Sequence, residues 1–243
     1  MISEDRAMTQ DEQQYRENCN PFRNIPRKKL DIAVEKIKNR FSDDNGILTI
    51  EGGRIVEALQ RYYETNIPVD YWFREMSNFK GSKILVDYYN KVTKSISYSY
   101  DNGTNICFAG SHGNGKSLTI SCILKRVVES AKYDALYVNL ADIVSFLTSK
   151  GEDRETARNL LLSVDFLAID EFDDRFMGSD NASDLFGRIL ESVLRTRIQN
   201  QLPIFLCTNS PNVKSIFAGP LQSSINSLMR KVKIIPILGK DFR

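Results

Sequence analysis

Histidine is nearly absent from this chain of 243 residues, since His112 is its only one. The four cysteines, Cys19, Cys107, Cys122 and Cys207, are scattered and form no C-x-x-C pair. We therefore expect no zinc site built from closely spaced cysteine and histidine ligands. Cys107 and Cys207 lie inside short apolar runs, where a free cysteine behaves as a small buried hydrophobic residue. This pattern favours a reducing, cytosolic environment.

Long apolar runs and a strong charge of one sign are missing as well. No stretch of about 18 apolar residues is present, so we expect no membrane-spanning helix. The N-terminal segment MISEDRAMTQDEQQYRENC is polar and has no apolar centre, which argues against a secretory signal peptide. The net charge is only +2, so any binding of nucleic acid must depend on local patches rather than on bulk charge.

The first hundred residues predict amphipathic helices. Apolar residues recur at helical spacing in RKKLDIAVEKIKNRF, residues 27–41. The segments IVEALQRYYETNIP, residues 55–68, and GSKILVDYYNKVTKSI, residues 81–96, predict two more helices. A capping-box pattern at Thr9–Glu12 predicts a short helix near the start of the sequence.

From residue 105 onward, short apolar runs alternate with longer amphipathic stretches. Five of these runs predict strands: NICFAG, ALYVNL, DFLAID, PIFLCTNS and KIIPIL. Strands that alternate with helices imply a parallel sheet covered on both faces, with right-handed crossovers. We expect an α/β fold with a helical extension over 1–63, a connecting segment over 64–104 and a sheet-containing core over 105–243.

The stretch GSHGNGKS matches the phosphate-binding pattern G-x-x-x-x-G-K-[ST], between a predicted strand and a predicted helix. Its glycines let backbone N–H groups turn toward a phosphate, and the N-terminus of the next helix favours the same anion. In this interpretation Lys116 reaches the outer phosphates and Ser117 holds Mg²⁺. The residues predicted to bind the nucleotide are Gly110, Ser111, His112, Gly113, Asn114, Gly115, Lys116 and Ser117. The alternative is a glycine-rich turn without a ligand.

Two other predicted strands end in polar residues. Asp170 and Glu171 follow the apolar run FLAI, and Asn209 follows IFLCT. In open parallel sheets, ligands bind beside the carboxyl ends of the strands. Asp170 is therefore a candidate ligand of Mg²⁺, Glu171 a candidate general base for an attacking water, and Asn209 a candidate for orienting that water. The structural alternatives are a helix cap at 170–171 and an ordinary turn at 209.

These three motifs, in this order and spacing, resemble the core of an AAA+ ATPase, in which Asn209 occupies the sensor-1 position. Residues 64–81, ETNIPVDYWFREMSNFKG, and residues 223–243, SSINSLMRKVKIIPILGKDFR, are similar to the segments that flank this core in DnaC/DnaI-type helicase loaders and IstB-type transposition helpers. The resemblance covers roughly residues 64–243. It implies a P-loop core with a five-stranded parallel sheet between helices and, since the sequence stops at Arg243, no C-terminal lid.

The resemblance also assigns catalytic roles to arginines. Arg243, after Phe242, falls at a sensor-2-like position. An ungapped alignment back from Arg243 places Ser227 where the family usually has an arginine finger. Arg230 lies one helical turn further along and shares that face of the helix. Either Arg230 substitutes for the finger, or the finger is missing and hydrolysis is weak or depends on a partner.

By resemblance, the chain is an ATP- and Mg²⁺-dependent ATPase that loads a hexameric replicative DNA helicase. Residues 1 to about 60 would grip the helicase, although a solvated cap on the core is the alternative. The resemblance implies a nucleotide-controlled switch on single-stranded DNA, with self-association through the core, in the cytoplasm of a bacterial host or a phage-infected cell. Candidate DNA contacts are Lys214, Phe217, Arg230, Lys231 and Lys233.

Two other functions remain open at this point. One is an IstB-type transposition helper that assembles on duplex DNA in the presence of ATP. The other is a nucleotide-binding adaptor with little hydrolysis, which the serine at position 227 motivates.

Overall fold

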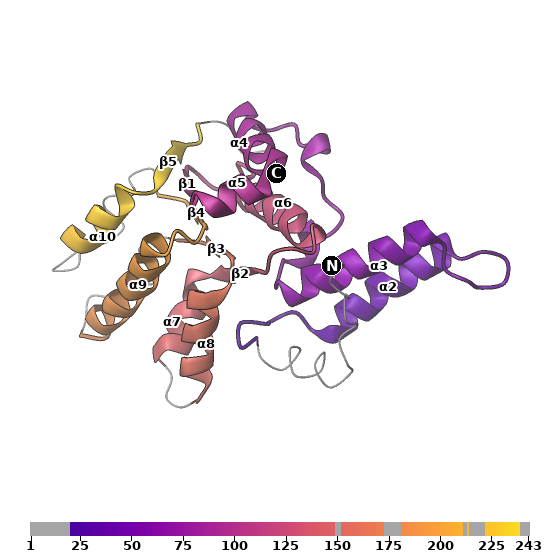
Figure 1. Cartoon of the computed structure of the whole chain (residues 1–243), viewed down its shortest axis with the longest axis horizontal. Helices are drawn as coiled ribbons and strands as arrows, with labels where there is room; N and C mark the ends of the chain where they lie inside the picture. Colours follow the sequence, from indigo (N-terminus) through magenta and orange to yellow (C-terminus); the bar gives the residue numbers. More distant parts are fainter. Residues whose placement is uncertain (1–19, 149–151, 173–180, 211–212, 214–221, 239–243) are drawn as a thin grey trace, which may run out of the picture.

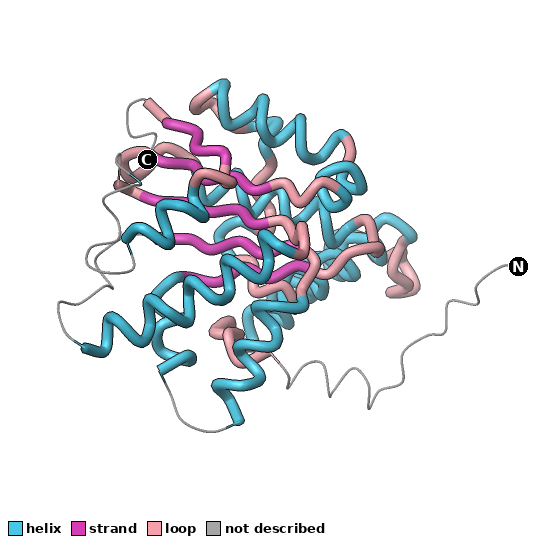
Figure 2. Tube along the Cα trace, turned by 60° about the vertical axis from the view of Figure 1, so that its left-hand side comes forward, coloured by secondary structure: helices cyan, strands magenta, loops and turns pink. Residues whose placement is uncertain are grey.

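The computed structural model describes residues 20–148, 152–172, 181–210, 213 and 222–238. Within these ranges the chain forms a five-stranded parallel sheet with helices packed against both of its faces (Figure 1 and Figure 2). The α/β class predicted from the alternation of short apolar runs and amphipathic segments is confirmed. No helix in the described part of the chain is long and apolar enough to cross a membrane.

The strand order brings the predicted motifs together. The strands are β1 (Asn105–Ala109), β2 (Ala135–Asn139), β3 (Phe166–Asp170), β4 (Ile204–Thr208) and β5 (Lys233–Pro236). They lie in the order β2-β3-β4-β1-β5, and each neighbouring pair is parallel. Because β1, β4 and β3 are consecutive and parallel, the three motifs that follow them emerge at the same edge of the sheet.

Two groups of helices cover the sheet. One side carries α4 (Lys83–Lys94), α5 (Ile96–Asp101) and α6 (Lys116–Glu129), with a hairpin of α2 (Arg27–Phe41) and α3 (Ile50–Glu64) packed beside them. The other side carries α7 (Leu140–Thr148), α8 (Glu152–Ser163), α9 (Asn181–Gln199) and α10 (Gln222–Met229). Two short 3₁₀ helices, η1 (Val69–Tyr71) and η2 (Met76–Asn78), lie between α3 and α4.

Successive buried side chains along β1, β2, β3 and β4 alternate between two apolar clusters. In β1, Ile106 and Phe108 face the cluster that includes α6, whereas Cys107 and Ala109 face the cluster of α7, α8 and α9. The first cluster continues into the hairpin of α2 and α3. Each fully buried aliphatic or aromatic side chain contributes about 1.5–3 kcal/mol. The continuous apolar runs of the sequence are thus explained by burial on both faces.

The predicted helices correspond to observed ones, with two differences. The α3 helix begins at Ile50, five residues before the predicted Ile55, because the Thr49 side chain caps it by accepting a hydrogen bond from the Gly52 N–H at 3.1 Å. The helix predicted over 81–96 ends at Lys94, and Ser95 begins a separate helix, α5. The helix predicted at Thr9–Glu12 lies outside the described residues, and the division at residues 63 and 104 stays a prediction.

A buried arginine joins the elements at the amino ends of the strands. Arg197, on α9, is fully buried, and burial lowers its pKa to about 10. Its Nη1 donates to the carbonyls of Leu161 at 2.9 Å and Val164 at 2.8 Å. Its Nη2 donates to the carbonyls of Asp165 and Pro203, both at 3.0 Å. One guanidinium therefore satisfies four carbonyls at the end of α8 and before β3 and β4.

Replacing Arg197 tests this assignment. Arg197→Met keeps most of the side-chain volume but removes four hydrogen bonds, and only the Pro203 carbonyl among the four also accepts from another donor, the Leu167 N–H at 3.2 Å. We therefore expect the free energy of unfolding to fall by about 2–5 kcal/mol. Urea denaturation followed by circular dichroism measures this loss. Arg195→Met is the matched control, because Arg195 is exposed and pairs with Glu191 on the same helix, an interaction that contributes little to stability. Equal losses in the two variants would contradict the assignment.

Candidate nucleotide-binding site

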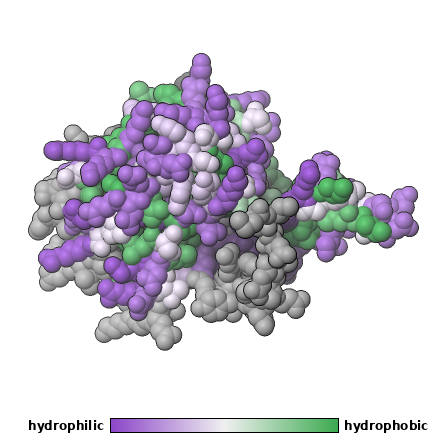
Figure 3. Space-filling model, in the orientation of Figure 1, coloured by the Kyte–Doolittle hydropathy of each residue, from purple (hydrophilic) through white to green (hydrophobic). Residues whose placement is uncertain are grey.

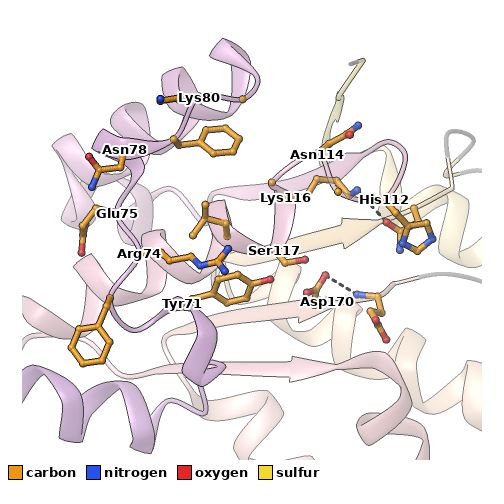
Figure 4. Close-up of a pocket in the computed structure, with 18 residues that line it drawn as sticks. Tyr71, Arg74, Glu75, Asn78, Lys80, His112, Asn114, Lys116, Ser117 and Asp170 are labelled. Atoms are coloured by element: carbon orange, nitrogen blue, oxygen red, sulfur yellow. Dashed lines mark hydrogen bonds between the residues drawn. The ribbon is translucent and has the colours of Figure 1, made fainter. Parts of the chain in front are cut away.

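A pocket of about 660 Å³ lies at the carboxyl ends of the strands. The loop and first turn that follow β1 form one wall. Beside it lie Asp170 at the end of β3, Glu171 directly after that strand and Asn209 after β4. The segment that contains Tyr71 and the residues up to 81 forms the opposite wall (Figure 4). All three sequence motifs therefore reach a single cavity.

Several positions of the loop between β1 and α6 favour glycine, and Gly115 and Gly110 show two different reasons. Gly115 has a φ of +86° and caps α6, a left-handed conformation that favours glycine. At Gly110, a Cβ atom would come within 2.3 Å of the Ile237 carbonyl oxygen. Asn114 is buried, and its Nδ2 donates to the Ser111 Oγ at 3.1 Å and to the Ile237 carbonyl at 3.5 Å. The segment that follows β5 therefore holds the loop in place.

The ammonium group of Lys116 is surrounded by protein oxygens. The residue is only 5% exposed, and its Nζ donates to the carbonyls of Gly110 and Ser111, both at 2.7 Å, and to the Asn209 Oδ1 at 3.1 Å. Burial lowers the pKa of Lys116, while nearby negative groups that include Asp170 oppose this shift. A phosphate at this loop would compete with these oxygens for the ammonium. Because Asn209 already touches Lys116, both residues can reach the same phosphate.

Asp170 is buried and held by two donors. One carboxylate oxygen accepts a hydrogen bond from the Tyr137 hydroxyl, and the other accepts from the Glu171 N–H at 2.8 Å. Burial and the Asp170 charge raise the pKa of Tyr137 well above its usual value, so the phenol keeps its proton and remains a donor. Ser117 lies on the same side of the pocket as Asp170 (Figure 4). A serine hydroxyl and a carboxylate are oxygen ligands of the kind that Mg²⁺ prefers.

These residues fit a magnesium ion held jointly by protein and nucleotide. Among the described residues, no group of three or more His, Cys, Asp and Glu residues could hold a metal by itself. Mg²⁺ usually keeps several waters and takes one or two carboxylates together with phosphate oxygens. Ser117 and Asp170 would therefore hold Mg²⁺ only together with a bound phosphate.

Glu171 has a strained backbone that directs its side chain outward. Its φ of +50° lies in the left-handed region, which costs a non-glycine residue about 1–2 kcal/mol. The next residue imposes this conformation, because Phe172 is fully buried and its N–H donates to the Cys207 carbonyl at 2.8 Å. As a result the Glu171 side chain is exposed at the edge of the pocket, where a water molecule can reach it.

The opposite wall contains residues that sequence reasoning did not assign to the site. The Tyr71 hydroxyl points toward Ser117 and Asp170 (Figure 4). Burial and the Asp170 charge raise the pKa of Tyr71, and its hydrogen bond with Ser117 opposes this shift. The Phe79 ring lies against the loop, since a Cβ atom on Gly115 would come within 2.4 Å of its Cζ. The only signal in the sequence was the similarity of residues 64–81 to the segment before an AAA+ core.

The predicted arginines do not line this pocket in the described part of the chain. Arg230 is exposed directly after α10, and Ser227 is exposed on the last turn of that helix. Lys231 and Lys233 are also exposed. Arg243, Lys214 and Phe217 lie outside the described residues. The catalytic and DNA-binding roles assigned to all these positions stay predictions.

No protein-family model matches the sequence, and no curated protein matches it. The fold is nevertheless similar to solved structures. The DnaI structure has a TM-score of 0.57 and 15% identity, over 70% of this chain and 94% of that chain. The DnaC helicase loader has a TM-score of 0.53 and 17% identity, over 70% of this chain and 99% of that chain.

A replication initiator, DnaA bound to AMPPCP and single-stranded DNA, has a TM-score of 0.56 and 17% identity over 72% of this chain. The match spans 51% of the DnaA chain, about half of its length. At these identities the likeness concerns the fold alone. The chain has the α/β P-loop fold of the DnaC/DnaI-like AAA+ ATPases, and this part of the resemblance seen in the sequence is confirmed.

Replacing Lys116 tests the site directly. Lys116→Ala removes the only ammonium that the loop offers to a phosphate, and a hydrogen bond to a charged group contributes about 1.5–3 kcal/mol. We therefore expect the affinity for ATP to fall about 10- to 100-fold or more, measured by titration with a fluorescent ATP analogue. Lys132→Ala, at an exposed lysine beyond α6, should bind like the wild type. Unchanged affinity in Lys116→Ala would remove Lys116 from the site.

Proposed function

We propose that this chain is an ATPase that loads a hexameric replicative DNA helicase onto single-stranded DNA and is switched by its nucleotide. The observation that carries the proposal is the convergence of Lys116, Asp170 and Asn209, from the ends of three neighbouring strands, on one pocket. This convergence occurs in a fold similar to those of DnaI and the DnaC helicase loader. Many classes of protein bind nucleotides, so the similarity of the fold to DnaI and the DnaC helicase loader is what supports helicase loading in particular.

Each residue of the pocket has a defined task in this proposal. The loop N–H groups and Lys116 bind the phosphates, and the Phe79 ring offers a flat apolar surface to the base. Mg²⁺, when bound, would neutralise the phosphate charge beside Ser117 and Asp170. Glu171 accepts a proton from the attacking water, and Asn209 orients that water toward the terminal phosphate. The exposed position of Glu171 gives water access to its carboxylate.

The hairpin of α2 and α3 supports a contact with a protein partner. It projects from the core (Figure 1), and its outer end carries two highly exposed apolar residues, Ile47 at 65% and Ile50 at 80%. Figure 3 shows apolar atoms at this end among hydrophilic ones. A partner that covers this end would bury both isoleucines. We infer that residues 1 to about 60 grip the helicase and that this end of the hairpin takes part.

DNA binding and hydrolysis would both involve the region after α10. Arg230, Lys231 and Lys233 are exposed there, and the Lys233 ammonium lies 5.2 Å from the centre of the Tyr88 ring. Cations next to an aromatic ring suit a single strand, because they bind its phosphates while the ring stacks on a base. Arg230 could also complete the site of a neighbouring copy, if the ATPase cores associate. We place this assembly in the cytoplasm of a bacterial host or a phage-infected cell.

A second candidate function rests on Ser227. This residue is exposed at the position where the family usually has an arginine finger. An arginine finger can accelerate hydrolysis by about 10³–10⁵. If Arg230 does not replace it, the chain would act as a nucleotide-binding adaptor whose hydrolysis stays slow or depends on a partner.

The loader proposal is tested by mass photometry of the chain mixed with the replicative helicase of its host. With ATP and Mg²⁺ we expect a complex of one helicase hexamer with several copies of this chain. Ile47→Asp combined with Ile50→Asp should weaken the complex, because both side chains are exposed in the free protein and their replacement leaves its core intact. The Glu171→Gln variant should keep ATP affinity, lose about 10²-fold or more in turnover and prolong the complex.

Other outcomes would contradict parts of this proposal. No complex with either ATP or ADP would exclude helicase loading. Assembly only on duplex DNA with ATP would favour the transposition helper. Turnover that stays at background with helicase and DNA present would favour the adaptor, and unchanged turnover in Glu171→Gln would exclude Glu171 as the base.

A further inference from the structure

Lys125, on the helix α6, carries a charge and is nevertheless only 1% exposed. Lysine is almost never buried to this extent unless its charge is paired. The nucleotide pocket does not explain why Lys125 is buried, because Lys125 is not among the residues that line this pocket. Its partners therefore indicate what it does.

Four oxygen atoms surround the Lys125 ammonium. Its Nζ donates to the carbonyls of Arg74 at 2.8 Å, Trp72 at 3.1 Å and Tyr71 at 3.4 Å, and to the Glu75 carboxylate at 2.8 Å. All four oxygens come from the segment 71–75, which bends around the ammonium. This segment joins the two short helices η1 and η2. Its Tyr71 carbonyl also accepts from the Arg74 N–H at 3.2 Å, whereas the Trp72 and Arg74 carbonyls take their donors from α6. An apolar side chain could fill the space but could not supply them.

The same segment, and Met76 directly after it, contact α6 at one further point each. The Thr119 hydroxyl lies 3.8 Å from the Met76 sulfur, and the Cys122 Sγ lies 3.5 Å from the Arg74 carbonyl. Residues 119, 122 and 125 are spaced by three, so they share one face of the helix. Since the N-terminus of α6 belongs to the phosphate-binding loop, this one helix fixes both walls of the nucleotide pocket.

We propose that Lys125 is a positioning residue of the nucleotide site. It holds the segment 71–75 on α6. This places Tyr71 beside Ser117, and it places Phe79, four residues after the end of the segment, against Gly115. The proposal rests on the nucleotide site proposed above.

The position of Lys125 also links the nucleotide site to the N-terminal hairpin. The Lys125 Nζ lies 5.3 Å from the centre of the Tyr62 ring, which belongs to α3. The Tyr62 hydroxyl in turn donates to Glu129, at the end of α6. A shift of the segment 71–75 would therefore reach the hairpin through Lys125.

The segment contains its own spectroscopic reporter. Trp72 is the only tryptophan of the chain; it is buried, and its Nε1 donates to the Ile67 carbonyl at 2.7 Å. Release of the segment would expose the indole to water and move its emission to longer wavelength. Tryptophan emission thus measures the attachment of the segment independently of any nucleotide.

The first test is Lys125→Met, which preserves volume but removes the donor. We expect a red-shifted Trp72 emission and an affinity for a fluorescent ATP analogue that is weaker by about 10-fold or more. Lys132→Met, at an exposed lysine just beyond α6, should change neither quantity. Wild-type affinity together with wild-type emission in Lys125→Met would overturn the proposal. If the wild-type chain does not bind the analogue, the proposed function fails, while the emission of Lys125→Met still tests the attachment.

The second test is Glu75→Lys, which also serves if Lys125→Met does not fold. Glu75 is half-exposed, so its replacement leaves the core intact. The new ammonium repels Lys125 and should release the segment, weakening binding of the ATP analogue several-fold. If only the charge of the pocket mattered, binding would become tighter, because the variant replaces a carboxylate in the pocket lining by a cation and ATP is an anion. Equal or tighter binding, without a shift of Trp72 emission, would overturn the proposal.

Discussion

The burial of both faces of the parallel sheet is the constraint on which the rest of the structure depends. Because helices cover both faces of β1 to β4, the polar groups of these four strands gather at the two ends of the strands. At the amino ends, Arg197 donates to four carbonyls at the end of α8 and before β3 and β4. At the carboxyl ends, Lys116, Asp170 and Asn209 meet in one pocket. The amino ends of the strands therefore contribute to stability, and the carboxyl ends carry the residues of the nucleotide pocket.

The helix α6 connects this chemistry to the rest of the molecule. It carries two buried lysines, Lys116 and Lys125, about 13 Å apart along the helix axis. Each ammonium is surrounded by oxygen atoms, from the phosphate-binding loop and Asn209 in one case and from the segment 71–75 in the other. A nucleotide that displaces the contacts of Lys116 acts on the helix that also carries Lys125 and its contacts with the segment 71–75. This gives the loader proposal a physical route from the pocket to the hairpin of α2 and α3.

Local patterns predicted the elements well, because apolar periodicity and glycine spacing are properties of neighbouring residues. The helix over 27–41 and the end of β3 at Asp170 are examples. The strand order and the opposite wall depend on contacts between distant residues, such as Lys125 with Trp72 across 53 positions. A lysine is expected to be exposed, so nothing in the sequence marked Lys125 as buried. Tyr137 was missed because its hydrogen bond to Asp170 joins two different strands, a contact that the pattern of neighbouring residues does not predict.

The central claim is that the pocket at the carboxyl ends of β1, β3 and β4 binds a nucleoside triphosphate through its phosphates. Calorimetric titration of the chain with AMPPCP in the presence of Mg²⁺, compared with AMP, tests it most directly. The account predicts saturable binding of one AMPPCP per chain and far weaker binding of AMP, because Lys116 and the loop N–H groups contact the outer phosphates. Equal affinity for AMP, or no saturable binding of AMPPCP, would contradict it.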